Sequence, residues 1–212
     1  DVLVAVGVVI VVMMLIVPLP VVLLDTLMSL NLVFALLTIL ITLYIKNALE
    51  FSVFPTLLLV VTVYGLALNV SSTRLILSQG EEFDGRIIQA FSSFVVGAAG
   101  TEGLVIGLII FIIIIAVQFI VITKGATRVA EVAARFTLDS LPGKQMAIEQ
   151  EYSSGAITEE ESTKRKLDLE REVDFYGAMD GASKFVQGNV RVGLLITAVN
   201  IVGGIVVGMT IH

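Results

Sequence analysis

Long apolar segments constrain the fold of this chain more than any other feature. Aliphatic and aromatic side chains dominate residues 2–17, 21–45, 51–70, 104–123 and 192–211. A helix of about 20 such residues matches the ~30 Å hydrocarbon core of a bilayer, and the first segment is only just long enough. With 57% hydrophobic residues, a soluble domain could hardly bury this surface. The sequence therefore predicts an all-α polytopic membrane protein with about five transmembrane helices.

The charged residues gather between the last two apolar segments. Residues 124–190, together with Arg191, hold 10 of the 13 basic and 12 of the 19 acidic residues. We therefore divide the chain into residues 1–123 with four spans, a charged loop at 124–190, and residues 191–212 with the fifth span.

The charged loop is expected to be folded and helical. Apolar spacing predicts a helix over Thr127–Ser140, which Pro142–Gly143 would stop. Thr158 and Glu161 have the spacing of a capping box, so a second helix should begin there and end at Gly177. Pairs four residues apart, Glu160 with Lys164 and Glu161 with Arg165, support that helix.

Between the third and fourth spans, residues 71–102 form an expected interfacial segment. It should begin with a short amphipathic piece, followed by a turn at Gly80–Gly85. Arg86–Val96 places its apolar side chains at helical spacing, which is typical of a helix lying on a membrane surface.

Basic residues near the span ends predict the orientation. Lys46 lies between spans two and three, and Lys124, Arg128, Arg135 and Arg191 flank the charged loop. Because cytoplasmic loops carry the excess of lysine and arginine, we expect the charged loop and the turn at 46–50 in the cytoplasm. Both ends of the chain look like the limits of a piece of a longer protein.

Several functional classes are disfavoured. The sequence has no cysteine, and its one histidine, His212, is the last residue, so we expect no metal site. Pro142-Gly143-Lys144 lacks the flanking residues of a phosphate-binding loop. We therefore expect no enzyme activity and no cofactor, and the net charge of −6 lacks the basic footprint of a nucleic-acid partner.

The candidate functional residues are charges in or beside the spans. Asp25 is the one acid well inside an apolar segment, and it is either a site on an ion path or an interfacial carboxylate that caps a helix. Arg74 is either a coupling residue or an interfacial anchor. Asn31, Asn69, Gln118 and Asn200 are expected to form hydrogen bonds between helices.

Arg128 and Arg135 share one helix face, and Asp139 follows four residues after Arg135. The set is either a structural ladder of ion pairs or one that changes its pairing when a proton or substrate arrives. Lys184 is either a phospholipid anchor or the counter-charge of a carboxylate.

Four stretches resemble a known family: Leu49–Leu59, Leu66–Arg74, Lys124–Met146 and Asp174–Val186. They are similar to the large export-gate subunit of bacterial type III secretion systems, flagellar and virulence-associated (the FHIPEP family). The resemblance implies a multi-pass inner-membrane protein in a nine-membered homo-oligomeric ring, which couples proton-motive force to protein export. It implies membrane lipids, other export subunits, exported proteins and chaperones as partners, the last two through a C-terminal domain.

The resemblance places ion-coupling positions at Arg74, Arg128, Arg135, Asp139 and Lys184. The chain also departs from the family pattern, with Gly65 where arginine is usual, Asn189 where aspartate is usual, Glu149 where aspartate is common, and a different sequence at Ala98–Glu102. Because asparagine cannot titrate, either another carboxylate such as Asp139, Glu149 or Asp180 serves coupling, or the subunit is specialised.

These observations leave alternative functions open. The first is a proton-coupled export gate, and the second is a ring scaffold without ion coupling of its own. An unrelated secondary transporter is the third, but the halves of the sequence show no repeat of the kind such transporters carry.

Overall fold

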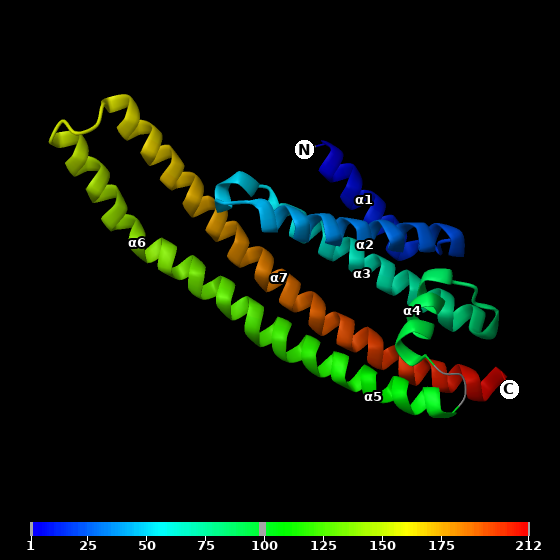
Figure 1. Ribbon diagram of the computed structural model, residues 1–212. Helices are drawn as coiled ribbons and strands as arrows, with labels where there is room; N and C mark the ends of the chain where they lie inside the picture. The colour runs from blue at the N-terminus through cyan, green and yellow to red at the C-terminus, as the bar shows by residue number, and fades with distance from the viewer. Residues whose placement is uncertain (1, 98–100, 212) are drawn as a thin grey trace.

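The structure is a computed structural model that describes residues 2–97 and 101–211, and every regular element among them is helical (Figure 1). The side chains of Ala98–Glu102 and His212 lie outside this description. The elements are α1 (Val2–Ile16), α2 (Val21–Tyr44), η1 (Ala48–Phe51), α3 (Phe54–Gln79), η2 (Gly80–Glu82), α4 (Arg86–Val96), α5 (Thr101–Val117), η3 (Gln118–Ala126), α6 (Thr127–Ser153) and α7 (Glu159–Ile211).

Four stretches of helix are long and apolar enough to cross a membrane, namely Val21–Tyr44, Phe54–Gln79, Val105–Ser153 and Glu159–Thr210. α1 is a further apolar helix of 15 residues. At 1.5 Å per residue it is about 22 Å long, so it is shorter than a typical span. The expected all-α membrane fold with about five spans is confirmed.

The buried core lies where α1, α2 and α3 meet. Leu24 of α2 is fully buried there, beside α1 and α3 residues. The Tyr64 hydroxyl donates a hydrogen bond to the carbonyl oxygen of Leu27 at 2.7 Å, which ties α3 to α2. α1 ends just before Pro18 and α2 begins just after Pro20, as the loss of helical donors at proline predicts. The core cluster consists of Val11, Met14, Leu24, Ala67, Leu68 and Leu75.

The charged loop is a long helical hairpin. α5, η3 and α6 follow one another without a break, and α7 returns alongside them for 53 residues (Figure 1). The paired helices extend well past the ends of α2 and α3. We call residues 124–190 the charged hairpin. Its tip is a turn that contains Gly155 at φ 76°, a conformation that glycine adopts without steric cost.

The expected helix ends inside the hairpin were wrong. α6 continues through Pro142 to Ser153, although proline removes one backbone donor from the helix. α7 likewise continues through Gly177 into the last span. Both helices have a partner along their length, since α7 packs against α6 and α3. Packing of this kind outweighs the local cost of a single proline or glycine.

The segment between the third and fourth spans was predicted in part. Residues 71–79 belong to α3 and do not start a separate piece, because α3 continues along α7. The turn begins at Gly80, whose φ is 55°, and α4 covers Arg86–Val96 as expected. The Thr158 cap is present, with the Glu161 backbone N–H donating to Thr158 Oγ1 at 3.2 Å, while the Glu161 carboxylate accepts a hydrogen bond from Arg165.

Candidate functional site

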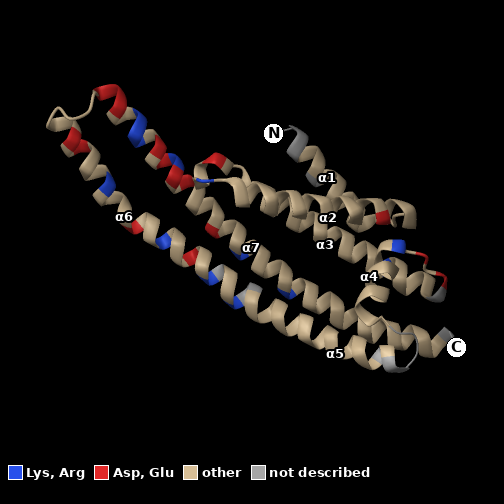
Figure 2. Cartoon of the chain, in the orientation of Figure 1, with Lys and Arg blue, Asp and Glu red and all other residues tan. Residues whose placement is uncertain are grey.

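The charged residues collect in the part of the hairpin that extends beyond the other helices (Figure 2). The turn between α2 and α3 lies against this part of α7. Leu49 and Ser52 of the turn line a cavity of about 520 Å³ together with Asp168, Arg171 and Asp174 of α7. The turn at 46–50 and the charged hairpin therefore lie on the same side of the spans, as the basic residues predicted.

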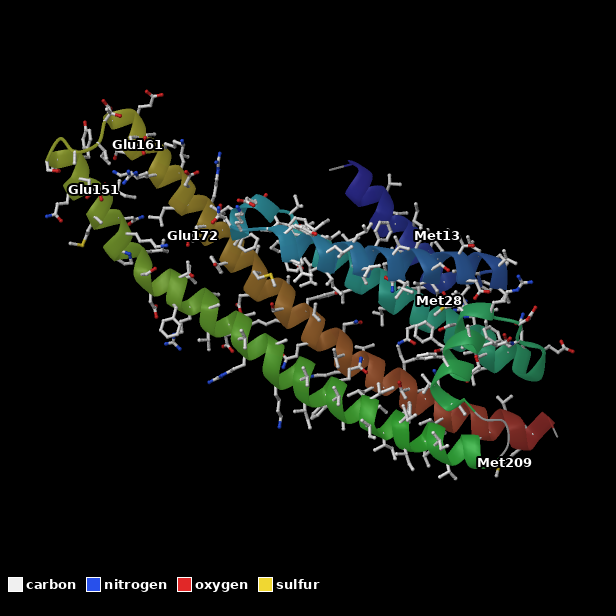
Figure 3. All side chains as sticks on the ribbon, in the orientation of Figure 1. Met13, Met28, Glu151, Glu161, Glu172 and Met209 are labelled. Carbon is white, nitrogen blue, oxygen red and sulfur yellow. The ribbon has the colours of Figure 1, made fainter. Side chains whose placement is uncertain are left out.

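Ion pairs join α6 to α7 across the hairpin. The Lys144 ammonium donates to both carboxylate oxygens of Glu172 at 3.0 Å. Closer to the tip, Arg165 of α7 donates to Glu151 of α6 at 2.7 Å and, within α7, to Glu161 at 3.2 Å. Figure 3 labels the three glutamates. These side chains are partly exposed, so each pair adds little stability.

The ladder on α6 is looser. Arg135 Nε lies 3.9 Å from Asp139 Oδ2, and Arg128 Nη1 lies 4.0 Å from Glu131 Oε2. The Arg135 and Asp139 side chains are 83% and 73% exposed. Arg128 thus pairs with Glu131, which the sequence analysis had not singled out, and the structure does not connect Arg128 to Asp139.

The remaining hairpin candidates have closer partners. Glu149 accepts from Lys166 at 3.3 Å, and Asp180 accepts from Lys184 at 2.7 Å. Lys184 is therefore the counter-charge of a carboxylate, one of the alternatives its position allowed. The hydrogen bond that Lys184 donates to Asp180, the negative charge of Asp180 and that of Glu131 raise the pKa of Lys184. The stabilisation from this pair is therefore present at neutral pH and is lost only when alkaline pH rises through the raised pKa of Lys184.

Asp25 and Arg74 lie at the opposite end of the spans. The Asp25 carboxylate accepts the backbone N–H groups of Arg86 at 2.9 Å and Ile87 at 3.3 Å, so it caps the start of α4. The Arg74 guanidinium donates to the carbonyl oxygens of Ile16 at 2.9 Å and Leu15 at 3.1 Å, at the end of α1. The candidate residues are thus divided between two regions, one at each end of the membrane helices.

One of the four polar amides is shown bridging two spans. Asn200 Nδ2 of α7 donates to Thr73 Oγ1 of α3 at 3.0 Å, which confirms the expected hydrogen bond between helices. The Oδ1 atoms of Asn31 and Asn189 are buried and, among the described residues, have no hydrogen-bond partner. Asn189 therefore places an uncharged acceptor, unpartnered within the described part of the chain, in a buried position on α7.

The Lys184 pair predicts slow chemical modification. At mildly alkaline pH, Lys184 should react with an amine acylating reagent more slowly than the exposed Lys164, because the pairing with Asp180 raises the pKa of Lys184 and lowers the fraction of free amine. Peptide mapping by mass spectrometry after short labelling gives both rates. An Asp180→Asn variant should bring the rates together, and equal rates in the original protein would contradict the pairing.

The family comparison covers nearly the whole chain. The FHIPEP family model matches residues 11–212. The chain therefore belongs to the FHIPEP family, in agreement with the stretches that carried the resemblance.

Individual relatives match with high identity. The Flagellar biosynthesis protein FlhA of Borreliella burgdorferi is 67% identical over 212 residues, which is all of this chain and 30% of the relative. The proteins of the same name from Bacillus subtilis and Escherichia coli are 52% identical over 209 residues and 46% identical over 202 residues, covering 99% and 94% of this chain. The chain spans about 30% of the length of these relatives. No solved structure matches it significantly.

Proposed function

We propose that this chain is the membrane portion of a flagellar protein export subunit in the bacterial inner membrane, with the charged hairpin in the cytoplasm. The observation that carries the proposal is the identity of 46–67% to flagellar biosynthesis proteins along almost the whole chain. Between a flagellar and a virulence-associated export system, this favours the flagellar one. The basic residues beside the spans support a cytoplasmic hairpin.

The subunit is proposed to couple proton-motive force to protein export, with no covalent catalysis. In this scheme, the carboxylate that changes partner lies in the hairpin. Glu149 and Asp180 are held by lysines at 3.3 and 2.7 Å, whereas Asp139 has only an arginine at 3.9 Å and is 73% exposed. Of these three carboxylates, Asp139 is therefore the one held least closely by a cation, and the Asn189 amide cannot ionise.

The proposed assembly is a homo-oligomeric ring, nine-membered by family resemblance, in contact with membrane lipids and other export subunits. Exported proteins and chaperones would bind a C-terminal domain. The alternative is a scaffold that forms the ring without ion coupling. The regular ion pairs Lys144–Glu172 and Arg165–Glu151 favour it, because they would keep the hairpin in one fixed shape.

A deletion strain tests the export role. Cells without this gene should assemble the membrane base of the flagellum yet secrete no hook or filament protein, and a plasmid copy should restore secretion. Quantifying these proteins in culture medium by immunoblot, with total cell content as control, gives the result. Normal secretion in the deletion strain would refute the proposal.

A further inference from the structure

α4 is a short amphipathic helix at the end of the bundle opposite the charged hairpin. It has 11 residues, which is about 16 Å of helix and therefore about half of a hydrocarbon core. Its neighbours α2 and α5 have their first turns at the same end, and it contacts both of them (Figure 1). α4 thus lies where the membrane helices reach the bilayer surface.

One edge of α4 is largely exposed. Phe91 is 56% exposed and Phe94 is 87% exposed, whereas Ile87 and Ile88 are half-buried. The polar residues Gln89 and Ser93 lie on the other side of the helix. Exposed phenylalanines beside a polar face are typical of helices that lie in the headgroup region.

Contacts at both ends hold α4 in this position. At its start, the Asp25 carboxylate accepts the backbone N–H groups of Arg86 and Ile87. Near its end, Val96 packs against Gly107 of α5, where an added Cβ would lie only 2.9 Å from a Val96 methyl carbon. The position of the helix is therefore set by the protein, and its apolar edge is left for another partner.

We propose that α4 is a membrane-surface helix. Its Phe91–Phe94 edge lies in the headgroup and upper acyl region of the leaflet opposite the charged hairpin. Asp25 is the residue that positions the helix there. Lipid is the occupant because this edge adjoins exposed apolar surface of a span. Val22 of α2 is 79% exposed and lines a groove with Ile87 of α4, and Ile87 shares one helix face with Phe91 and Phe94. A helix too short to cross, placed at the ends of crossing helices, can reach that depth and no deeper.

Tryptophan fluorescence measures this depth directly, because residues 1–212 contain no tryptophan. In the full-length protein, any tryptophan outside these residues is replaced by phenylalanine, and Phe94→Trp is introduced. The variant is reconstituted in phosphatidylcholine–phosphatidylglycerol vesicles. Lipids with a quencher near the headgroup should quench the indole more strongly than lipids with a quencher near the chain ends. Quenching by neither lipid, or stronger quenching by the deep one, overturns the proposal.

Matched positions calibrate the depth. Phe34 lies near the middle of α2 and its side chain is exposed. In a Phe34→Trp variant, the quencher near the chain ends should therefore quench the indole more strongly than the quencher near the headgroup. Phe136→Trp lies on the exposed surface of the hairpin and should respond to neither. If the position 94 variant behaves like the position 136 variant, water or a protein partner covers α4, and the lipid assignment is wrong.

The role of Asp25 has its own test. In vesicles, Asp25→Ala, which removes both acceptor oxygens, should accelerate hydrogen exchange at the start of α4 roughly fivefold, the ratio that corresponds to loss of a typical helix N-cap. It should also weaken shallow quenching at position 94. Asp84→Ala removes an exposed carboxylate two residues before α4 that makes no cap, and it should change neither. An unchanged Asp25→Ala protein, or equal effects of both variants, overturns the positioning role, and unchanged quenching at position 34 shows that the spans have folded.

Discussion

Asp139→Asn is expected to reduce flagellar protein export to nearly the level of the deletion strain while the assembled apparatus stays intact. The change keeps the shape of the side chain but removes its charge and its ability to take up a proton. In the structure Asp139 is 73% exposed and makes only a 3.9 Å contact with Arg135, so its loss leaves the fold unaffected. A large loss of export would therefore report on coupling.

The matched control for this experiment is Asp168→Asn. Asp168 also pairs with an arginine on its own helix, Arg171 at 3.3 Å, and is partly exposed. This variant should export normally, and both variants should be compared at equal membrane levels by immunoblot. Normal export by Asp139→Asn with intact rings would leave the scaffold as the better account of the chain. Equal losses in both variants would indicate a general need for charge on the hairpin.

Leu24→Ala is expected to lower the free energy of unfolding by about 2 kcal/mol. Leu24 is the largest fully buried side chain among the described residues, at the junction of α1, α2 and α3. Its removal opens a cavity whose walls lose their dispersion contacts. This loss of unfolding free energy is at the low end of the range for replacing a buried leucine by alanine, because in a membrane the unfolded helices still face apolar lipid.

Unfolding in mixed micelles of a mild detergent and dodecyl sulfate measures the loss, followed by circular dichroism. Leu23→Ala is the matched control. Leu23 is the preceding residue on the same helix, and 42% of it is exposed on the surface that lipid would cover. Its replacement should change stability by less than about 0.5 kcal/mol. Equal effects of the two variants would mean that α1, α2 and α3 do not pack as described.

Properties that depend on neighbouring residues in the sequence could be predicted. The apolar segments, the proline break between α1 and α2, the Thr158 cap and the bounds of α4 all follow from local spacing. The continuation of α6 through Pro142 and of α7 through Gly177 could not be predicted in this way. Local propensity favours a helix break at proline and at glycine. Both helices stay continuous because α7 packs against α3 and α6, and these contacts join residues far apart in the sequence.

In the candidate site, contacts within one helical turn could also be predicted, whereas contacts between distant parts of the sequence could not. The Arg135–Asp139 and Asp180–Lys184 pairs are four residues apart, so helical spacing reveals them. Lys144–Glu172 joins residues 28 apart, and the cap of α4 joins Asp25 to a residue 61 positions later. For Asp25, the sequence could supply only the alternatives, an ion path or a cap. The choice required knowing which helix begins beside it.

The unbroken course of α7 has a mechanical consequence. Its 53 residues make a rod about 80 Å long, with one end among the apolar spans and the other at the hairpin tip. A stiff rod acts as a lever, so a tilt of about 10° about its membrane end would displace the tip sideways by about 14 Å. Because displacement grows along the rod, a shift of about 5 Å across the ~30 Å membrane part would thus become a movement larger than the diameter of a helix at the hairpin tip.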